Sequence, residues 1–248
     1  MIHVEYQSTD YIRLAELRKQ IDACPLCHGR DQTCSCYSAF KFEMNQINSN
    51  VRLKFRNVTL DNIKDAELAP VVSEVQKYLN NFDDYIKQGI GLYLYGNPGT
   101  AKTTLGTIIL LEALRRNHRC WVTIPDNYLN MLNDRTPEGY SDLAEVNNVA
   151  FMMIEDLGRE YRDRGGYIES HLEELIRSRA DNRLTTIITT NKSEHELCSE
   201  NNRLLSILQE HYIPVQFSTK DYRRHTLGRD LRNGHKKKTI DTKKVSKG

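Results

Sequence analysis

The sequence predicts an α/β fold, a three-layer sandwich around a central parallel sheet, preceded by a small cysteine-rich module. Three observations predict it. Apolar runs of strand length alternate with helical patterns from Val51 onward, which is typical of a parallel sheet flanked by helices. A glycine-rich turn follows the apolar run at 92–95 and precedes a helical pattern. Four of the six cysteines lie within residues 24–36 and set the N-terminal segment apart.

Length and composition limit the organisation. A chain of 248 residues is long enough for one full core and an appendage, since domains typically contain about 100 to 200 residues. The chain has 39% hydrophobic and 27% charged residues, which is typical of a globular protein. No stretch approaches the ~20 apolar residues that are needed to cross a bilayer. Residues 1–10 lack a basic segment followed by an apolar one, so we expect a cytoplasmic, reducing location without membrane contact.

Charge is distributed unevenly. Residues 221–248 contain ten Lys and Arg against three Asp, whereas the remainder contains 25 basic and 30 acidic residues. Such a segment suits contact with nucleic acid phosphates, and it is equally typical of a solvated, disordered tail. We therefore expect a basic, disordered tail at 226–248, with nucleic acid contact as an open alternative.

The clustered cysteines predict a zinc site. Cys24, Cys27, Cys34 and Cys36 follow the spacing C-x₂-C-x₆-C-x-C, and four thiolates from two tight turns complete a tetrahedral Zn²⁺ shell. Two disulfides are the alternative, which a reducing compartment disfavours. His28 is a further candidate ligand, but four cysteines already complete the shell.

A short amphipathic helix is expected at 11–23, before the cysteines. Its apolar residues recur at near-helical spacing: Ile12, Leu14, Leu17 and Ile21. A module of under about 50 residues has too little core to fold without such a metal. We therefore expect residues 1–45 to form a zinc-binding module that docks a partner protein.

The elements of the second domain, 46–225, follow from periodicity and apolar runs. Helical patterns and buried-strand runs alternate, and the predicted order is helix 69–85, strand 91–95, helix 102–116, strand 120–124, strand 149–156, helix 167–179, strand 184–190 and strand 213–217. Asp126 is placed to cap another helix. Pro137 and Gly139 predict a loop at 135–141.

The turn after the first strand is typical of a phosphate-binding loop. Its backbone N–H groups would point at an anion, Lys102 would reach the outer phosphates of ATP, and the Thr103 hydroxyl would bind Mg²⁺. Ala101 stands where the strict G-x-x-x-x-G-K-[ST] pattern has glycine, and the loop resembles the G-x-P-G-x-A-K-[ST] loop of MCM helicases. An unrelated strand, turn and helix is the alternative. The predicted nucleotide-binding residues are Gly96, Asn97, Pro98, Gly99, Thr100, Ala101, Lys102, Thr103 and Thr104.

Polar residues end two of the predicted strands. The run V-A-F-M-M-I-E-D ends at Glu155 and Asp156, and L-T-T-I-I-T-T is followed by Asn191. Ligands of open parallel sheets lie beyond the carboxyl ends of the strands, so we expect these side chains beside the phosphate loop. Two charges that merely end a strand in solvent, and an asparagine that merely caps a loop, are the alternatives. In the functional interpretation, Asn191 orients water or senses the γ-phosphate.

Residues 51–225 resemble an AAA+ ATPase of the DnaC and DnaI helicase-loader group, which is related to IstB-type transposition helpers. Four runs carry the resemblance: V-R-L-K-F-R-N-V-T-L-D-N-I, I-E-D-L-G, L-I-R-S-R-A-D-N-R-L-T-T-I-I-T-T-N and K-D-Y-R. A cysteine-rich module ahead of the ATPase is similar to DnaI-type loaders. The short remainder after the last strand resembles the group's reduced C-terminal lid.

The resemblance implies a role for several residues. Lys102 would hold the β- and γ-phosphates, Thr103 would bind Mg²⁺, and Asn191 would be sensor 1. The group usually has Asp followed by Asp or Glu in its Walker B strand, whereas here Glu155 takes the metal-side place and Asp156 the water-polarising place. Because the side-chain lengths depart from the usual pair, we expect slow hydrolysis.

Two arginines complete the implied catalytic set. The group's arginine finger falls where Ser206 and Ile207 stand, so Arg203 is the nearest candidate. Arg223 in the D-Y-R-R run is the sensor 2 candidate. The alternatives for the finger are Arg179 and Arg183, and any of these arginines can instead be simple surface charge.

The resemblance implies an ATP-dependent loader that places a hexameric replicative helicase on single-stranded DNA. ATP would favour a self-associated ring or spiral, and hydrolysis would release the loader. An IstB-type helper that assembles on duplex DNA is the nearest alternative. A P-loop kinase and a structural adaptor with little turnover are alternatives from other classes.

Overall fold

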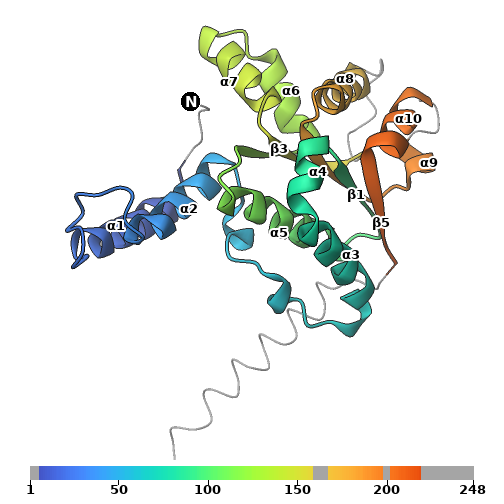
Figure 1. Ribbon diagram of the computed structural model, residues 1–248. Helices are drawn as coiled ribbons and strands as arrows, with labels where there is room; N and C mark the ends of the chain where they lie inside the picture. The colour runs from blue at the N-terminus through green and yellow to red at the C-terminus, as the bar shows by residue number, and fades with distance from the viewer. Residues whose placement is uncertain (1–5, 159–166, 198–201, 219–248) are drawn as a thin grey trace, which may run out of the picture.

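The computed structural model describes residues 6–158, 167–197 and 202–218. The sensor 2 candidate Arg223 and the tail predicted at 226–248 lie outside these residues. Figure 1 shows a sheet with helices on both faces and a helical arm that extends to one side.

The central sheet has five parallel strands in the order β2-β3-β4-β1-β5. The predicted strands are all present, and their bounds are β1 (Gly91–Gly96), β2 (Cys120–Thr123), β3 (Phe151–Leu157), β4 (Thr185–Thr190) and β5 (Tyr212–Phe217). Successive residues of a strand face opposite sides, so Leu92 and Leu94 pack in one apolar cluster and Tyr93 packs in another. Because both faces are covered, the strands are apolar runs and not alternating ones.

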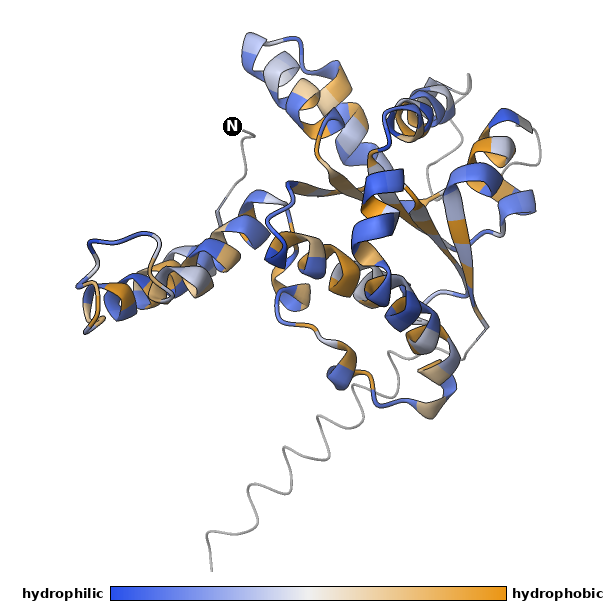
Figure 2. Cartoon of the chain, viewed as in Figure 1, coloured by the Kyte–Doolittle hydropathy of each residue, from blue (hydrophilic) through white to orange (hydrophobic). Residues whose placement is uncertain are grey.

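Two helical layers cover the sheet, which confirms the three-layer sandwich. One layer consists of α3 (Ala69–Asn80), α4 (Phe82–Gln88) and α5 (Lys102–Arg115), which contribute to the same apolar cluster. The other contains α6 (Pro125–Asn133), α7 (Pro137–Asn147), α8 (Tyr167–Asp181) and α10 (Asn202–His211), with the short α9 (Glu194–Leu197) before α10. Figure 2 shows the apolar strands enclosed between helices whose outer faces are hydrophilic.

Three local predictions were wrong. The helix expected at 69–85 is broken at Asn81, which has non-helical dihedral angles (φ −109°, ψ 19°) and donates its side-chain amide to the carbonyl of Lys77. Asp126 lies inside the first turn of α6, which begins at Pro125, so it does not cap that helix. The segment expected to be a loop at 135–141 contains the start of α7.

The start of α7 has a plain physical reason. Thr136 is the N-cap, and its hydroxyl oxygen accepts a hydrogen bond from the N–H of Gly139 at 3.0 Å. Pro137 is the first helical residue, where its fixed φ is favourable and its missing N–H costs nothing. The Thr-Pro pair is therefore a helix start and not a turn.

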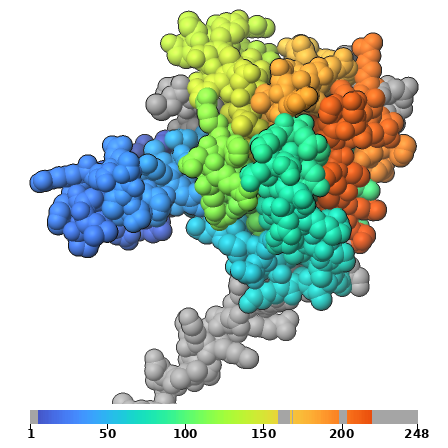
Figure 3. Space-filling view, in the orientation of Figure 1, coloured from blue at the N-terminus to red at the C-terminus, as the bar shows by residue number. Residues whose placement is uncertain are grey.

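The N-terminal arm consists of α1 (Ser8–Asp22), the cysteine-containing loop and α2 (Cys36–Asn48). It projects from the body in Figure 3. Leu17 and Ile21 are buried as expected, but Ile12 is 61% exposed. The domain boundary expected at residue 45 falls inside α2, which packs on α5.

The arm joins the sheet without a linker. Ser49 and Asn50, directly after α2, lie along the outer edge of β2, where the N–H of Val122 donates to the Ser49 carbonyl at 2.9 Å. The Asn50 side-chain amide donates to the Val122 carbonyl at 3.0 Å. These contacts cover part of an edge strand that would otherwise be open to pairing.

A buried ion cluster also attaches the arm. Arg56 is 6% exposed, and its guanidinium pairs with Asp10 of α1 and lies 3.8 Å from a carboxylate oxygen of Glu43 of α2. Although burial would raise it, the pKa of Asp10 is lowered, because Arg56 and the N–H of Gln7 donate hydrogen bonds to its carboxylate. Charges enclosed in this way need all their partners.

Within the ranges described above, none of the helices combines the length and the apolar character needed to cross a bilayer.

We expect Asp10→Asn to lower the free energy of unfolding by about 2 to 4 kcal/mol, because it leaves the buried Arg56 charge without its main partner. Urea denaturation followed by circular dichroism measures this change. Glu16→Gln is the matched control, since Glu16 is 59% exposed in its ion pair with Arg13 and should cost under about 1 kcal/mol. Equal effects of the two substitutions would contradict a structural role for the cluster.

Candidate nucleotide site and metal centre

The carboxyl ends of the three central strands lie level. Tyr95 of β1 is in register with Thr190 of β4, and Thr190 is in register with Leu157 of β3. The phosphate loop follows β1 and Asn191 follows β4 directly. The sheet thus brings the loop, Asn191 and the acids of β3 to one edge, as the sequence predicts.

Two glycines shape the beginning of the loop. Gly96 has φ 134°, and a Cβ there would overlap the carbonyl of Phe217 on β5. Gly99 has φ 80°. Both conformations favour glycine, so the turn requires these residues.

Ala101 adopts the left-handed conformation of the glycine that it replaces, with φ 68° and ψ 14°. This conformation costs a residue with a Cβ about 1 to 2 kcal/mol. Ala101 precedes α5 and offers no side-chain acceptor to the first turn of that helix. The first N–H groups of α5 are therefore suited to an anion such as phosphate.

The side chain of Lys102, the first residue of α5, folds back onto the loop. It is buried, with the residue 6% exposed, and its ammonium donates hydrogen bonds of 2.7 Å to the carbonyls of Gly96 and Asn97. The Thr100 hydroxyl donates to the Asn97 carbonyl at 2.8 Å and keeps the turn closed. The ammonium is thus held at the mouth of the turn, where phosphate oxygens can replace the carbonyls as acceptors.

Glu155 and Asp156 lie at an irregularity near the end of β3. The register between β3 and β4 shifts between Ile154 and Leu157, and Asp156 has φ 56°. The N–H of Asp156 donates to the Thr189 hydroxyl at 3.1 Å instead of continuing a regular ladder. A bulge of this kind re-aims side chains and is frequent beside functional sites.

Glu155 is 2% exposed and pairs with Arg52 from the segment before the sheet. Burial raises the pKa of Glu155 and the neighbouring Asp156 raises it further, whereas the Arg52 charge opposes both effects. Arg52 was not among the predicted site residues. The only signal was the alternation of basic residues in V-R-L-K-F-R, which did not indicate a partner.

The residues present fit a magnesium ion bound with nucleotide. Mg²⁺ prefers one or two carboxylates or hydroxyls together with phosphate oxygens. A half-buried Thr103 hydroxyl in the first turn of α5 and the enclosed Glu155 carboxylate provide such ligands. Asn191 is exposed beyond β4.

The candidate arginines differ in placement. Arg203 is exposed in the first turn of α10, whereas Arg179 is 1% exposed and donates to the Thr186 hydroxyl and to backbone carbonyls within its own subunit. Burial lowers the pKa of Arg179 to about 10. Arg183 precedes β4, at the amino edge of the sheet. Arg179 and Arg183 are thus at the opposite edge from the phosphate loop, and Arg203 remains the candidate finger.

The arm contains the predicted metal centre. One sulfur from each of Cys24, Cys27, Cys34 and Cys36 lies within 4.8 Å of the others. The Cys24 and Cys34 sulfurs are 3.9 Å apart, and those of Cys27 and Cys36 are 3.4 Å apart. Two sulfurs that are each about 2.3 Å from a tetrahedral Zn²⁺ lie ~3.8 Å from each other, so the cluster fits one zinc ion. His28 is not part of this cluster.

The thiols of the cluster have different acidities. The backbone N–H groups of Cys27 and Leu26 lower the pKa of Cys24 to about 7. Burial and the neighbouring thiols raise the pKa of Cys36. Zinc binds thiolates, so the surroundings of Cys24 favour the form that the metal needs.

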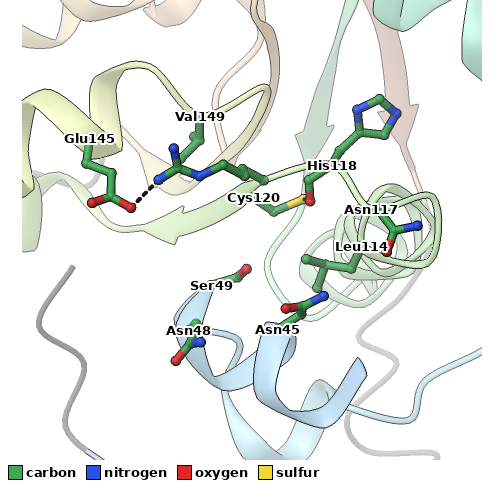
Figure 4. Close-up of a pocket in the computed structure, with 10 residues that line it drawn as sticks. Asn45, Asn48, Ser49, Leu114, Asn117, His118, Cys120, Glu145 and Val149 are labelled. Carbon is green, nitrogen blue, oxygen red and sulfur yellow. Dashed lines mark hydrogen bonds and ion pairs between the residues drawn. The ribbon is translucent and has the colours of Figure 1, made fainter. Parts of the chain in front are cut away.

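A separate pocket lies at the opposite edge of the sheet. Figure 4 shows Asn45 of α2 and Ser49, directly after α2, facing the start of β2 at Cys120, with the Arg119–Glu145 ion pair beside them. None of the predicted site residues lines it. We therefore place the functional site at the carboxyl edge and not in this pocket.

Strand order, phosphate loop and acidic strand end together match the AAA+ fold. The sequence matches no protein-family model and no curated protein. Solved structures of similar fold include the DnaC helicase loader, which is 21% identical, with a TM-score of 0.58 and coverage of 67% of this chain and 100% of that chain.

Two further solved structures share the fold. DnaI is 19% identical with a TM-score of 0.56, covering 70% of this chain and 94% of that chain. The replication initiator DnaA bound to AMPPCP and single-stranded DNA is 17% identical with a TM-score of 0.56, covering 75% of this chain and 56% of that chain. The predicted resemblance to DnaC and DnaI is confirmed at the level of the fold.

We expect Ala101→Gly to retain or slightly strengthen nucleotide binding, because it releases backbone strain of about 1 kcal/mol. Ala101→Val should weaken binding more than tenfold, since a β-branched residue is strongly disfavoured at positive φ. Fluorescence titration with mant-ATPγS measures both affinities. Loss of binding in Ala101→Gly would show that the loop needs the Ala101 methyl group.

Purified protein should contain one equivalent of zinc, measured by inductively coupled plasma mass spectrometry. Cys27→Ser should lower the zinc content and the helicity of the arm, because the cluster loses a ligand. Cys120→Ala is the matched control, since Cys120 is buried in the body, away from the cluster. Full zinc content in Cys27→Ser would refute the four-sulfur site.

Proposed function

We propose that the chain is an ATP-dependent loader that places a hexameric replicative DNA helicase on single-stranded DNA. The observation that carries this proposal is the joint presence of the phosphate loop, the Glu155–Asp156 strand end and a zinc-cluster arm on a fold similar to DnaC and DnaI.

ATP binding and hydrolysis are assigned to the carboxyl edge. Loop N–H groups and Lys102 bind the triphosphate, and Thr103 and Glu155 would hold Mg²⁺, which would neutralise charge on the phosphates. Asp156 accepts a proton from the water that attacks the γ-phosphate, while Asn191 orients that water. The bond to the β-phosphate breaks, giving ADP and phosphate, and the unusual acid order makes this step slow.

Self-association completes the site in this proposal. Because α10 leads directly into the amino end of β5, its first turn lies toward the carboxyl edge. Exposed Arg203 in this turn would reach the γ-phosphate of a neighbouring subunit in a ring or spiral. Hydrolysis removes that phosphate and loosens the assembly. Arg223 remains the sensor 2 prediction.

The arm supplies a surface for the helicase. Apolar side chains are unusually exposed there, with Leu26 at 81%, Tyr11 at 62% and Ile12 at 61%. Leu26 lies in the loop between two zinc ligands, which fixes its position. Exposed apolar side chains on a metal-stabilised module are typical of a protein contact.

Single-stranded DNA has a separate candidate surface. Tyr140 is 52% exposed and Tyr167 is 45% exposed, and the Arg135 guanidinium lies 3.4 Å from the Tyr140 hydroxyl. Aromatic rings beside a positive charge stack on bases and attract the backbone of single strands. The basic residues at 221–248 are a second candidate for this contact.

The test measures loading of the replicative helicase hexamer of the same organism onto circular single-stranded DNA, which has no end for threading. With ATP, the chain should raise the DNA-bound helicase several-fold. Lys102→Ala should abolish ATP binding and loading, because the phosphates lose their main charge partner. Leu26→Asp should abolish helicase binding but preserve ATP binding, and Gln32→Asp in the same loop is its control.

The alternative functions predict different results. ATP-dependent filaments on duplex DNA without helicase binding would indicate an IstB-type helper. Loading by Lys102→Ala at the wild-type level would indicate an adaptor that does not use nucleotide. Either outcome overturns the loader.

A further inference from the structure

Arg52 forms an ion pair that the proposed ATPase chemistry does not use. Its side chain is 50% exposed, whereas that of its partner Glu155 is 3% exposed. The guanidinium therefore reaches from the surface to an enclosed carboxylate. Glu155 is the acid assigned to Mg²⁺, so Arg52 and the metal would compete for the same group.

The arginine belongs to a short rigid segment. Arg52 is the N-cap and Arg56 the C-cap of the 3₁₀ helix η1 (Leu53–Phe55). The Arg52 guanidinium carbon lies 5.1 Å from the centre of the Phe55 ring, and Phe55 packs against the apolar cluster. A cation over an aromatic face is favourable, which helps to fix the direction of Arg52.

The other end of η1 is fixed in the arm. Arg56 pairs with Asp10 of α1, lies 3.8 Å from Glu43 of α2 and donates from Nε to the carbonyl of Val51 at 2.9 Å. One turn of helix thus has an arginine on the Walker B acid at its start and an arginine in the arm at its end.

We propose that Arg52 is a positioning residue that restrains Glu155 and, through η1 and Arg56, links Mg²⁺-nucleotide binding to the position of the arm. When Arg52 holds Glu155, Mg²⁺ lacks its protein carboxylate. When the metal takes the carboxylate, Arg52 is released and η1 loses a contact at one end. A partner that moves the arm would act on the same contact from the other end.

This inference rests on the proposed nucleotide site and adds a coupling that is reciprocal. If a partner that binds the arm weakens the Arg52–Glu155 pair, it strengthens Mg²⁺-nucleotide binding. Mg²⁺-nucleotide must then strengthen binding of the partner to the arm by the same factor. A loader would thereby distinguish the docked from the undocked state.

The test compares the affinity for mant-ATPγS in Mg²⁺ with that in EDTA. Arg52→Ala should tighten binding in Mg²⁺ by about five- to tenfold and leave binding in EDTA unchanged, because only the metal competes with Arg52. Lys54→Ala is the matched control, since Lys54 in the same segment acts on Glu155 as a nearby charge, without the direct ion pair that Arg52 forms. It should change neither affinity by more than twofold.

A second measurement follows the arm. In the wild type, Mg²⁺ with ATPγS should raise the hydrogen–deuterium exchange of η1 and of the facing turns of α1 and α2. In Arg52→Ala, exchange there should already be raised without nucleotide and should change little on binding. Lys54→Ala should behave as the wild type.

The outcomes separate the two proposals. If the wild type binds no nucleotide, the ATPase site and this inference both fail. If the wild type binds but Arg52→Ala weakens binding equally in Mg²⁺ and EDTA, Arg52 contacts nucleotide directly and the restraint is refuted. Unchanged affinities, or exchange in the arm that does not respond to nucleotide in the wild type, would also overturn it.

Discussion

The site depends on the hydrogen-bond register of three parallel strands. Because Leu157 of β3, Thr190 of β4 and Tyr95 of β1 are in register near the carboxyl ends of their strands, groups far apart in the chain arrive at one edge without long loops. The constraint is strict, since the close approach of β5 leaves no room for a Cβ at Gly96. Burial of the strands on both faces provides the rigidity, and the bulge at the end of β3 is the local departure that turns the acids out of the ladder.

The arm is structurally continuous with the body that contains the sheet. Helix α2, the Ser49–Asn50 contact with β2 and the enclosed charges around Arg56 attach it at three places. The cysteine cluster and the exposed Leu26 lie at the far end, whereas Tyr11 and Ile12 directly follow Asp10 at the attached end. Exposed apolar side chains therefore occur at both ends of the arm, and η1 is the element that meets both the arm and the candidate nucleotide site.

Sequence alone predicted the sheet, the phosphate loop and the cysteine cluster, because each depends on a local pattern. The strands are apolar runs bounded by turns, and the loop is a fixed spacing of glycines before a lysine. The start of α7 was missed because Pro137 was taken as a breaker, although proline is favoured at the first helical position. Arg52 could not be found, since its partner is 103 residues away in the chain and a half-exposed arginine has no distinctive pattern. The Asp10–Arg56 contact was missed for the same reason.

The direct contact of the arm with the sheet, without a linker, affects how such a chain can change in evolution. Residues 49–52 serve in turn as helix end, edge partner of β2 and start of the segment that reaches Glu155. Inserting one residue there would turn the following backbone by about 100° if it continued the helix, and Arg52 and Asn50 could not both keep their partners. We therefore expect an exchange of N-terminal modules to preserve these contacts when the junction lies within the helical hairpin, ahead of Glu43.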